Sequence, residues 1–307
     1  IETIEDYKDK DLSKLGKFDL SLLDLMDPIS IDSMNNSIQK LYILGMIHKN
    51  MYPTQIGIIS VKFRKLSVEN IKMILSGYHH KVNILDLITI AIFLTIGKQK
   101  IVIKGFESFV LKRCEIMRHK LLISCEFIDF VIFFNYFIKI VINNKSDISY
   151  IKRWCNEHFV LYEAMLNLIQ FRDDIIKEML FSLGLNPFIK YHSNLYKLMY
   201  EYDDRHPHLD IIEIKQLKKC IYEGYKLNIA KLVDNEYYTM NTHVPIKVRS
   251  YLINESIKLD NFKQTKPKQF IYSDVMLSGS DKFVFNVGSC ISIIDGFINI
   301  ANSFIMS

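Results

Sequence analysis

The sequence is poor in cysteine and has no pattern that would use it. Its cysteines number five and include no C-x-x-C pair, the spacing expected of a zinc knuckle or a redox motif. An odd, scattered set of thiols favours a reducing compartment over a disulfide-stapled secreted scaffold. The five are Cys114, Cys125, Cys155, Cys220 and Cys290.

Common catalytic signatures are also missing. The chain has no G-x-x-x-x-G-K-[ST] phosphate loop, no H-E-x-x-H zinc motif and no G-x-S-x-G nucleophile elbow. The Arg-His-Pro-His tract at 205–208, beside Asp203 and Asp204, has the donors for a metal, although an exposed linker is the more frequent explanation. We therefore expect no catalytic residue, no metal and no bound cofactor in this chain.

No hydrophobic run has the length of a membrane span. The two longest, 82–96 and 127–142, fall short of the roughly 18 uninterrupted apolar residues that a span needs. Asp86 interrupts the first run, and Asp129 and Lys139 interrupt the second. We expect both runs to be buried core helices, and we expect no membrane association.

Positive charge is concentrated in the middle of the chain. Residues 1–60 hold 6 basic against 9 acidic side chains, whereas residues 61–160 hold 16 against 8. Such a basic stretch attracts an anionic partner such as a phosphate backbone, and it equally suits a solvated helical face. Charge alone leaves both explanations open.

The first regular element is expected at 34–44. Ser30, Asp32 or Ser33 can cap a helix there, apolar residues recur at helical spacing, and Gly45 is placed to end it. Residues 47–60 then predict a short hairpin, or wing, and the start of another helix. Together these features indicate a winged-helix domain.

From 67 to 184 the sequence predicts helices throughout. Its clearest pattern is one helix that Ser146 or Asp147 can cap and that Gly184 ends. Trp154 and Cys155 are expected to be packing residues. The apolar stripe of this helix consists of Phe159, Tyr162, Leu166, Ile169, Ile176, Leu180 and Leu183. Basic side chains off the stripe are Lys152, Arg153, Arg172 and Lys177. Arg172 could instead pair with a neighbouring acidic residue inside the domain.

The last third changes to short strand-like runs. After a polar linker at 185–209, a helix is expected at 210–232, and runs rich in β-branched and aromatic residues follow it. Several short strands of this kind predict a small barrel. The runs are 236–240, 244–250, 268–277 and 282–287.

A series of short segments then identifies a likeness. In chain order they are LYILGMI (41–47), TQIG (54–57), KLSVENIKMIL (65–75), ILDLITIAIFL (84–94), WCNEHFVLYEAM (154–165), QFRDDI (170–175) and CIYEGYKLNIAKL (220–232). This order resembles the C-terminal region of superfamily 2 DEAH-box RNA helicases. That family writes Leu-Tyr-x-Leu-Gly and Thr-x-Leu-Gly in its winged helix, Trp-Cys-x-x-x-Phe-x-x-Tyr in its ratchet domain, and Gly-Phe-x-x-Asn-Val-Ala before its OB-fold.

The resemblance, over roughly residues 18–280, implies a mainly α fold with a C-terminal β-barrel. It implies a winged-helix domain at 1–66, a helical ratchet domain and linker at 67–209, and a lead-in helix and OB-fold at 210–307. Ile58 stands where the family usually has Arg, and Val68 where it has Pro. The scarcity of alanine suggests an A+T-rich genome, and the sequence is similar to helicases of large cytoplasmic DNA viruses of the poxvirus and asfarvirus type.

The same resemblance implies a function. In the family, two RecA-like domains bind ATP and Mg and hydrolyse the nucleotide, while the C-terminal modules hold and ratchet single-stranded RNA. This chain would then be part of a longer NTP-hydrolysing protein in the host cytoplasm or the virion, and its partners would be single-stranded RNA and the RecA-like domains of that protein. RNA contacts are expected beside Tyr251 and Phe270 on the OB-fold and along the ratchet domain, at Lys152, Arg153, Arg172, Lys247, Arg249, Lys266 and Lys268.

Two other functions compete with RNA guidance. In related helicases this region receives regulatory protein cofactors, so the chain could be a docking module that recruits a partner or regulates a helicase without binding RNA. Such a module would show no RNA affinity beyond the non-specific level. A free-standing winged-helix DNA binder is disfavoured, because the helix at 34–44 offers only Gln39 and Lys40 and residues 1–60 are net acidic.

Overall fold

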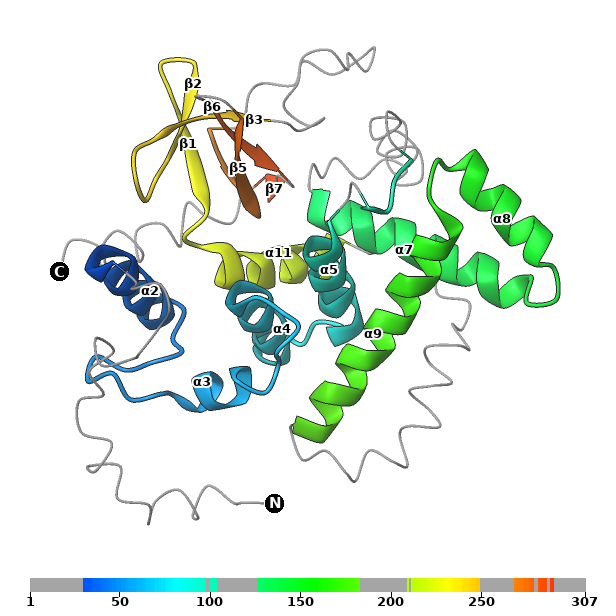
Figure 1. The fold of residues 1–307 in the computed structure, drawn as a ribbon, viewed down its shortest axis with the longest axis horizontal. Coiled ribbons are helices and arrows are strands. Elements are labelled where there is room, and N and C mark those ends of the chain that lie inside the picture. Colours follow the sequence, from blue (N-terminus) through cyan, green and yellow to red (C-terminus); the bar gives the residue numbers. More distant parts are fainter. Residues whose placement is uncertain are drawn as a thin grey trace.

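The computed structural model describes residues 30–97, 100–103, 126–182, 209, 211–248, 268–278, 281–285 and 288–289. Helices build most of this described part, and a small sheet lies at one end of it (Figure 1). The charged segment at 1–17 and nearly all of the expected linker at 185–209 lie outside the described residues.

α2 (Ile31–Ile43) is the first expected helix. Ser30 caps its start, because the Ser30 hydroxyl accepts a hydrogen bond from the Ser33 backbone N–H at 3.2 Å. At its end Gly45 takes a φ of +72°, and the N–H groups of Gly45 and Met46 donate back to carbonyls of the last turn. These paired bonds form a Schellman motif. The expected cap and glycine stop are therefore confirmed.

A hairpin and a short helix follow α2. An antiparallel bridge joins Ile47 to Pro53, and the His48 backbone N–H donates to the Tyr52 carbonyl at 2.8 Å. α3 (Gln55–Ser60) begins directly after this hairpin. The hairpin and helix start expected at 47–60 are confirmed.

Together with the helices at 148–157 and 211–225, four helices contribute to the main core. They are α4 (Val68–His80), α5 (Ile84–Ile96), α7 (Glu126–Asn143) and α9 (Tyr162–Ser182). α5 and α7 are the two long apolar runs, and both are buried as expected. In the part of the chain that the structure describes, no helix is both long and apolar enough to cross a membrane.

The helix expected from 146 onwards is divided in two. Asp147 caps α8 (Ile148–Glu157), as expected, by accepting from the Tyr150 N–H at 2.9 Å. The chain then turns before α9, because Phe159 has a φ of +56° and Val160 forms an antiparallel bridge with Val102. The expectation of one continuous helix is wrong at this turn.

α11 (Ile211–Tyr225) is shorter than the helix expected at 210–232. The C-terminal part of the expected helix is instead strand β1 (Ile229–Val233), which is hydrogen-bonded to a neighbouring strand on each side. A turn separates the two, and in it the Asn228 N–H donates to the Tyr225 carbonyl at 2.8 Å. Pairing with strands distant in sequence has overridden the local helical pattern.

The sheet contains seven strands in the order β5-β6-β3-β2-β1-β4-β7. Neighbours are antiparallel except β3 and β6, which are parallel. The four expected runs all contain strands, and the run at 268–277 holds two. The described strands do not close into a barrel, so the expected barrel is not observed. The strands after β1 are β2 (Glu236–Thr239), β3 (Pro245–Val248), β4 (Gln269–Ile271), β5 (Asp274–Ser278), β6 (Asp281–Phe285) and β7 (Gly288–Ser289).

Candidate functional site

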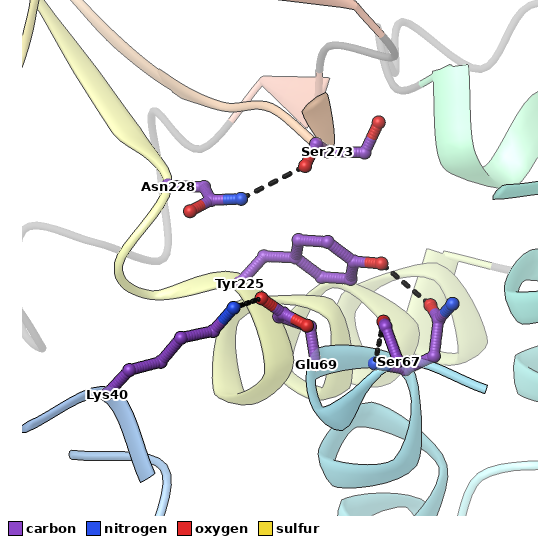
Figure 2. Close-up of polar contacts among 7 residues, drawn as sticks. Lys40, Ser67, Glu69, Tyr225, Asn228 and Ser273 are labelled. Carbon is purple, nitrogen blue, oxygen red and sulfur yellow. Dashed lines mark hydrogen bonds and ion pairs between the residues drawn. The ribbon is translucent and has the colours of Figure 1, made fainter. Parts of the chain in front are cut away.

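The Gly-Tyr-x-x-Asn segment at the end of α11 joins the helices to the sheet. A Cβ added at Gly224 would lie 2.5 Å from the Glu69 carbonyl oxygen and 2.8 Å from the Met73 Cβ. Glycine therefore allows α11 to approach α4 more closely than any other residue would. Beyond the helix, Asn228 Nδ2 donates to the Ser273 carbonyl at 3.0 Å, which fastens the turn to the sheet (Figure 2).

Asn70 is the centre of the polar contacts at this junction. Its Oδ1 accepts from the Tyr225 hydroxyl at 2.6 Å, and its Nδ2 donates to the Ala91 carbonyl and the Thr95 hydroxyl of α5, both at 3.4 Å. Burial, together with the nearby carboxylates of Glu69 and Asp274, raises the pKa of Tyr225 well above its usual value. The hydroxyl is therefore protonated and able to donate at neutral pH.

An ion pair connects α2 to the same junction. The Lys40 ammonium contacts the Glu69 carboxylate at the start of α4 (Figure 2). Lys40 was one of the two side chains considered for nucleic-acid contact on this helix. Its position shows an inter-helix contact, so the junction holds α2, α4, α11 and the sheet together.

Two of the expected RNA contacts lie on the sheet. Lys247 is exposed on β3, and Lys268 is exposed immediately before β4, where its carbonyl accepts from the Leu232 N–H at 2.9 Å. Phe270 is fully buried in the sheet's own core, so its ring is not open to a base. Three further candidates lie outside the described residues: Arg249, Tyr251 and Lys266.

Two other expected contacts lie on α8. The Lys152 ammonium lies 5.2 Å from the centroid of the Tyr162 ring, and the Arg153 guanidinium lies 5.2 Å from that of Tyr150. Both basic side chains are exposed. Trp154, on the opposite face, is only 8% exposed and is a packing residue, as expected.

Arg172 is not at the surface. Only 4% of it is exposed, its guanidinium lies 5.3 Å from the centroid of the Phe134 ring, and the neighbouring Asp173 is also buried. Of the two positions considered for Arg172, the surface one is wrong and the one inside the domain is observed, because Arg172 lies on the buried face of α9. The buried face of α9 includes Met165, Leu168, Arg172, Ile175, Ile176 and Met179.

The described candidates fall into two separate groups. α8 and the sheet lie at opposite ends of the described part (Figure 1). A ligand that contacted both Lys152 and Lys247 would have to extend along the whole helical body. The fold therefore defines two basic surfaces, and each requires its own test.

The described thiols and carboxylates do not build a reactive centre. Burial raises the pKa of Cys155 and of Cys220 to about 11, so both are thiols at neutral pH. Within the described ranges no three His, Cys, Asp or Glu side chains are grouped so that they could hold a metal. The His-Pro-His tract lies outside those ranges.

These observations define a mainly helical protein with a small sheet fixed to it through α11. No known protein family's profile matches the chain. Over its whole length it is 24% identical to proteins named "Putative RNA Helicase B962L" from African swine fever virus isolates of a tick from Pretoriuskop, a warthog from Namibia and a pig from Kenya. The match covers 32% of each relative, so this chain spans about a third of their length. The chain is thus homologous to part of a viral helicase-related protein.

Proposed function

We propose that this chain is the C-terminal accessory part of a DEAH-type viral RNA helicase and guides single-stranded RNA. The observation that carries the proposal is the similarity of the entire chain to one third of a viral protein named as an RNA helicase. The rest of such a protein has room for two RecA-like domains, which would bind ATP and Mg and hydrolyse the nucleotide. In this proposal the chain supplies RNA contacts and no catalytic group.

The element order supports a winged helix at the start of this region. α2, the hairpin around Ile47 and Pro53, and α3 follow one another within residues 1–66, the range expected for that domain. Thr54 fastens this arrangement, since its hydroxyl donates to the Gly45 carbonyl at 2.7 Å and accepts from the Gly57 N–H at 3.1 Å.

The strand order supports an OB-type barrel. β4 and β5 are separated by only Tyr272 and Ser273, so the two can be halves of one bent strand. Neighbouring strands are then β1, β2, β3, β6 and the bent strand, and the β4 half of the bent strand pairs with β1. A five-stranded, partly open barrel of this kind is the OB-fold, which commonly binds oligonucleotides.

The proposed RNA contacts are the exposed basic residues of the two surfaces. Lys247 and Lys268 would act on the sheet, with Arg249 and Lys266 beside them in sequence, and Lys152 and Arg153 would act on α8. Arg172 is not included, because a guanidinium buried against Phe134 has no access to a phosphate backbone.

Fluorescence anisotropy tests the proposal. Labelled single-stranded RNA, duplex RNA and single-stranded DNA are titrated with the full chain at two salt concentrations. We expect single-stranded RNA to bind most tightly, and its affinity to fall as salt rises, because the contacts are to phosphates. Equal binding to all three, or no binding, would overturn the proposal.

A second candidate, a protein-docking module, is favoured by one observation on α8. Ile148 at the start of α8 is 54% exposed and Leu161 just before α9 is 47% exposed, and exposed aliphatic side chains suit a protein partner better than RNA. If α8 docks a protein, Lys152→Ala combined with Arg153→Ala will leave RNA affinity unchanged.

A further inference from the structure

We propose that the outer face of the sheet, centred on Lys231 and Tyr238, binds single-stranded RNA, with Tyr238 stacking on a base and lysines contacting the neighbouring phosphates. The inference rests on the proposed function and assigns it to particular side chains. Neither residue was among the expected RNA contacts, because 210–232 was expected to be a helix.

The register brings four residues into one row. Lys231 lies directly opposite Tyr238 on one side and Gln269 on the other, and Tyr238 lies opposite Pro245. Residues directly opposite one another point to the same face, with Cβ atoms about 5 Å apart. Lys231 and Pro245 are exposed, and Tyr238 and Gln269 are partly exposed, so this row faces outwards.

The alternation of the strands confirms which face this is. Ala230, Tyr237, Ile246 and Phe270 are buried in the sheet's own core. Each of them is the immediate sequence neighbour of a residue in the row, and successive side chains of a strand point to opposite faces. Tyr237 is thus a core residue, whereas the adjacent Tyr238 is available to a ligand.

The row is extended by one more lysine. Lys247 lies two residues beyond Pro245 on β3 and therefore faces the same side. At about 4.8 Å per strand, the path from β4 to β3 is about 14 Å long. Two lysines, Lys231 and Lys247, therefore face outwards with the Tyr238 ring, and basic side chains beside an aromatic face suit a sequence-tolerant single-strand site. Glu236 lies on the same face, two residues before Tyr238.

Tyr238 is held in place by its own strand. Its hydroxyl donates to Glu236 Oε2 at 3.2 Å, which fixes the far end of the ring near the β1–β2 hairpin. This hydrogen bond and the charge of Glu236 raise the pKa of Tyr238. The ring is therefore neutral at physiological pH and does not repel a phosphate backbone.

The test compares two RNA probes with matched variants of the full chain. One probe is a fluorescein-labelled oligouridylate, and the other is an abasic strand of the same length. We expect Tyr238→Ala to lower affinity for oligouridylate about tenfold and to leave the abasic strand unaffected, because only stacking is lost. Tyr238→Phe keeps the ring and should keep the affinity.

The lysine variants complete the comparison. Lys231→Ala should weaken binding of both probes and reduce the salt slope by about 0.7, since one phosphate contact is lost from a single strand. Lys215→Ala, an exposed lysine on α11, is the control and should change neither. Circular dichroism confirms that each variant is folded.

Three results would overturn the inference. If Tyr238→Ala and Lys231→Ala behave like Lys215→Ala while the Lys152→Ala, Arg153→Ala variant loses affinity, the proposed function stands but its site is on α8. If Tyr238→Phe loses as much as Tyr238→Ala, stacking is excluded. If the unmodified chain binds neither probe, the inference and the proposed function fail together.

Discussion

At the scale of single residues, two glycines set how closely the elements approach. A Cβ at Gly57 would lie 2.0 Å from the Met46 carbonyl oxygen, and one at Gly224 would meet the backbone of α4 at Glu69. Both glycines belong to the segments that resemble helicase motifs. Their physical role in this fold is close packing, which explains why a side chain is absent at those positions.

Replacing Gly224 with alanine tests this close contact. Gly224→Ala should lower the free energy of unfolding by about 1–3 kcal/mol, because the contacted carbonyl and Met73 backbone cannot move aside cheaply. Urea denaturation measures the change, and Lys215→Ala on the same helix serves as the control. Equal stability of the two variants would show that α11 and α4 are less closely packed than described.

Removing the Tyr225 hydroxyl tests the polar centre of the junction. Tyr225→Phe leaves the buried Asn70 Oδ1 without its 2.6 Å donor, so we expect a loss of about 1–3 kcal/mol in unfolding free energy. Tyr238→Phe removes a hydroxyl from a more exposed ring and should cost much less. Thermal unfolding of the two variants decides between these expectations, and similar melting temperatures would contradict them.

The buried thiols predict a dependence of stability on alkaline pH. Burial raises the pKa of Cys155 and of Cys220 from 9.0 to about 11. Because the pKa of each thiol is higher in the folded state than in the unfolded state, the two protonated thiols make their full contribution to stability below pH 9. That contribution is lost as the pH rises towards 11. Unfolding free energies measured between pH 8 and 11 should fall less steeply for a Cys155→Ala, Cys220→Ala variant than for the unmodified chain. Parallel curves would contradict the expectation.

At the scale of elements, the sequence predicted those features that depend on residues close together in the chain. The cap and stop of α2 and the burial of α5 and α7 follow from residues within or next to each helix, and the sequence was sufficient for them. The end of α11 was not predictable in this way, because β1 exists through pairing with β2 and β4. Local periodicity has no access to such partners.

Arg172 illustrates the same limit at the candidate site. Its position off the expected stripe favoured a surface arginine, but Arg172 lies on the same buried face of α9 as Leu168 and Ile175. The chain turns between α8 and α9, where Val160 forms a bridge with Val102, which is far away in sequence. The exposed positions of Lys152 and Arg153 were predictable, since they lie on α8 before the turn.

The contact between the hairpin and α3 gives a prediction at this scale. Thr54→Ala removes both the cap of α3 and the hydrogen bond to the Gly45 carbonyl, so we expect a loss of about 1–2 kcal/mol. Thr54→Ser keeps the hydroxyl and should keep most of the stability. Urea denaturation of both variants provides the measurement, and equal losses would show that the methyl group, and not the hydroxyl, is what matters.

At the scale of the whole molecule, the sequence predicted two basic regions but not the distance between them. Basic residues were expected on the helical domain and on the strand-rich domain, and the fold keeps α8 and the sheet apart (Figure 1). Lys231 and Tyr238 were missed because their pairing is visible only in the register. The strand-like pattern of 229–233, read with the Tyr-rich run that follows, was the signal that could have indicated them.

The proposal that this chain guides single-stranded RNA through phosphate contacts is tested most directly by the salt dependence of its RNA affinity. For Lys231 and Lys247 on the outer face of the sheet, the logarithm of the binding constant should fall with the logarithm of salt concentration with a slope of about −1.4, at about −0.7 per contact. Single-stranded RNA should also bind more tightly than duplex RNA at every salt concentration. A slope near zero, or equal affinity for the two, would contradict the proposal.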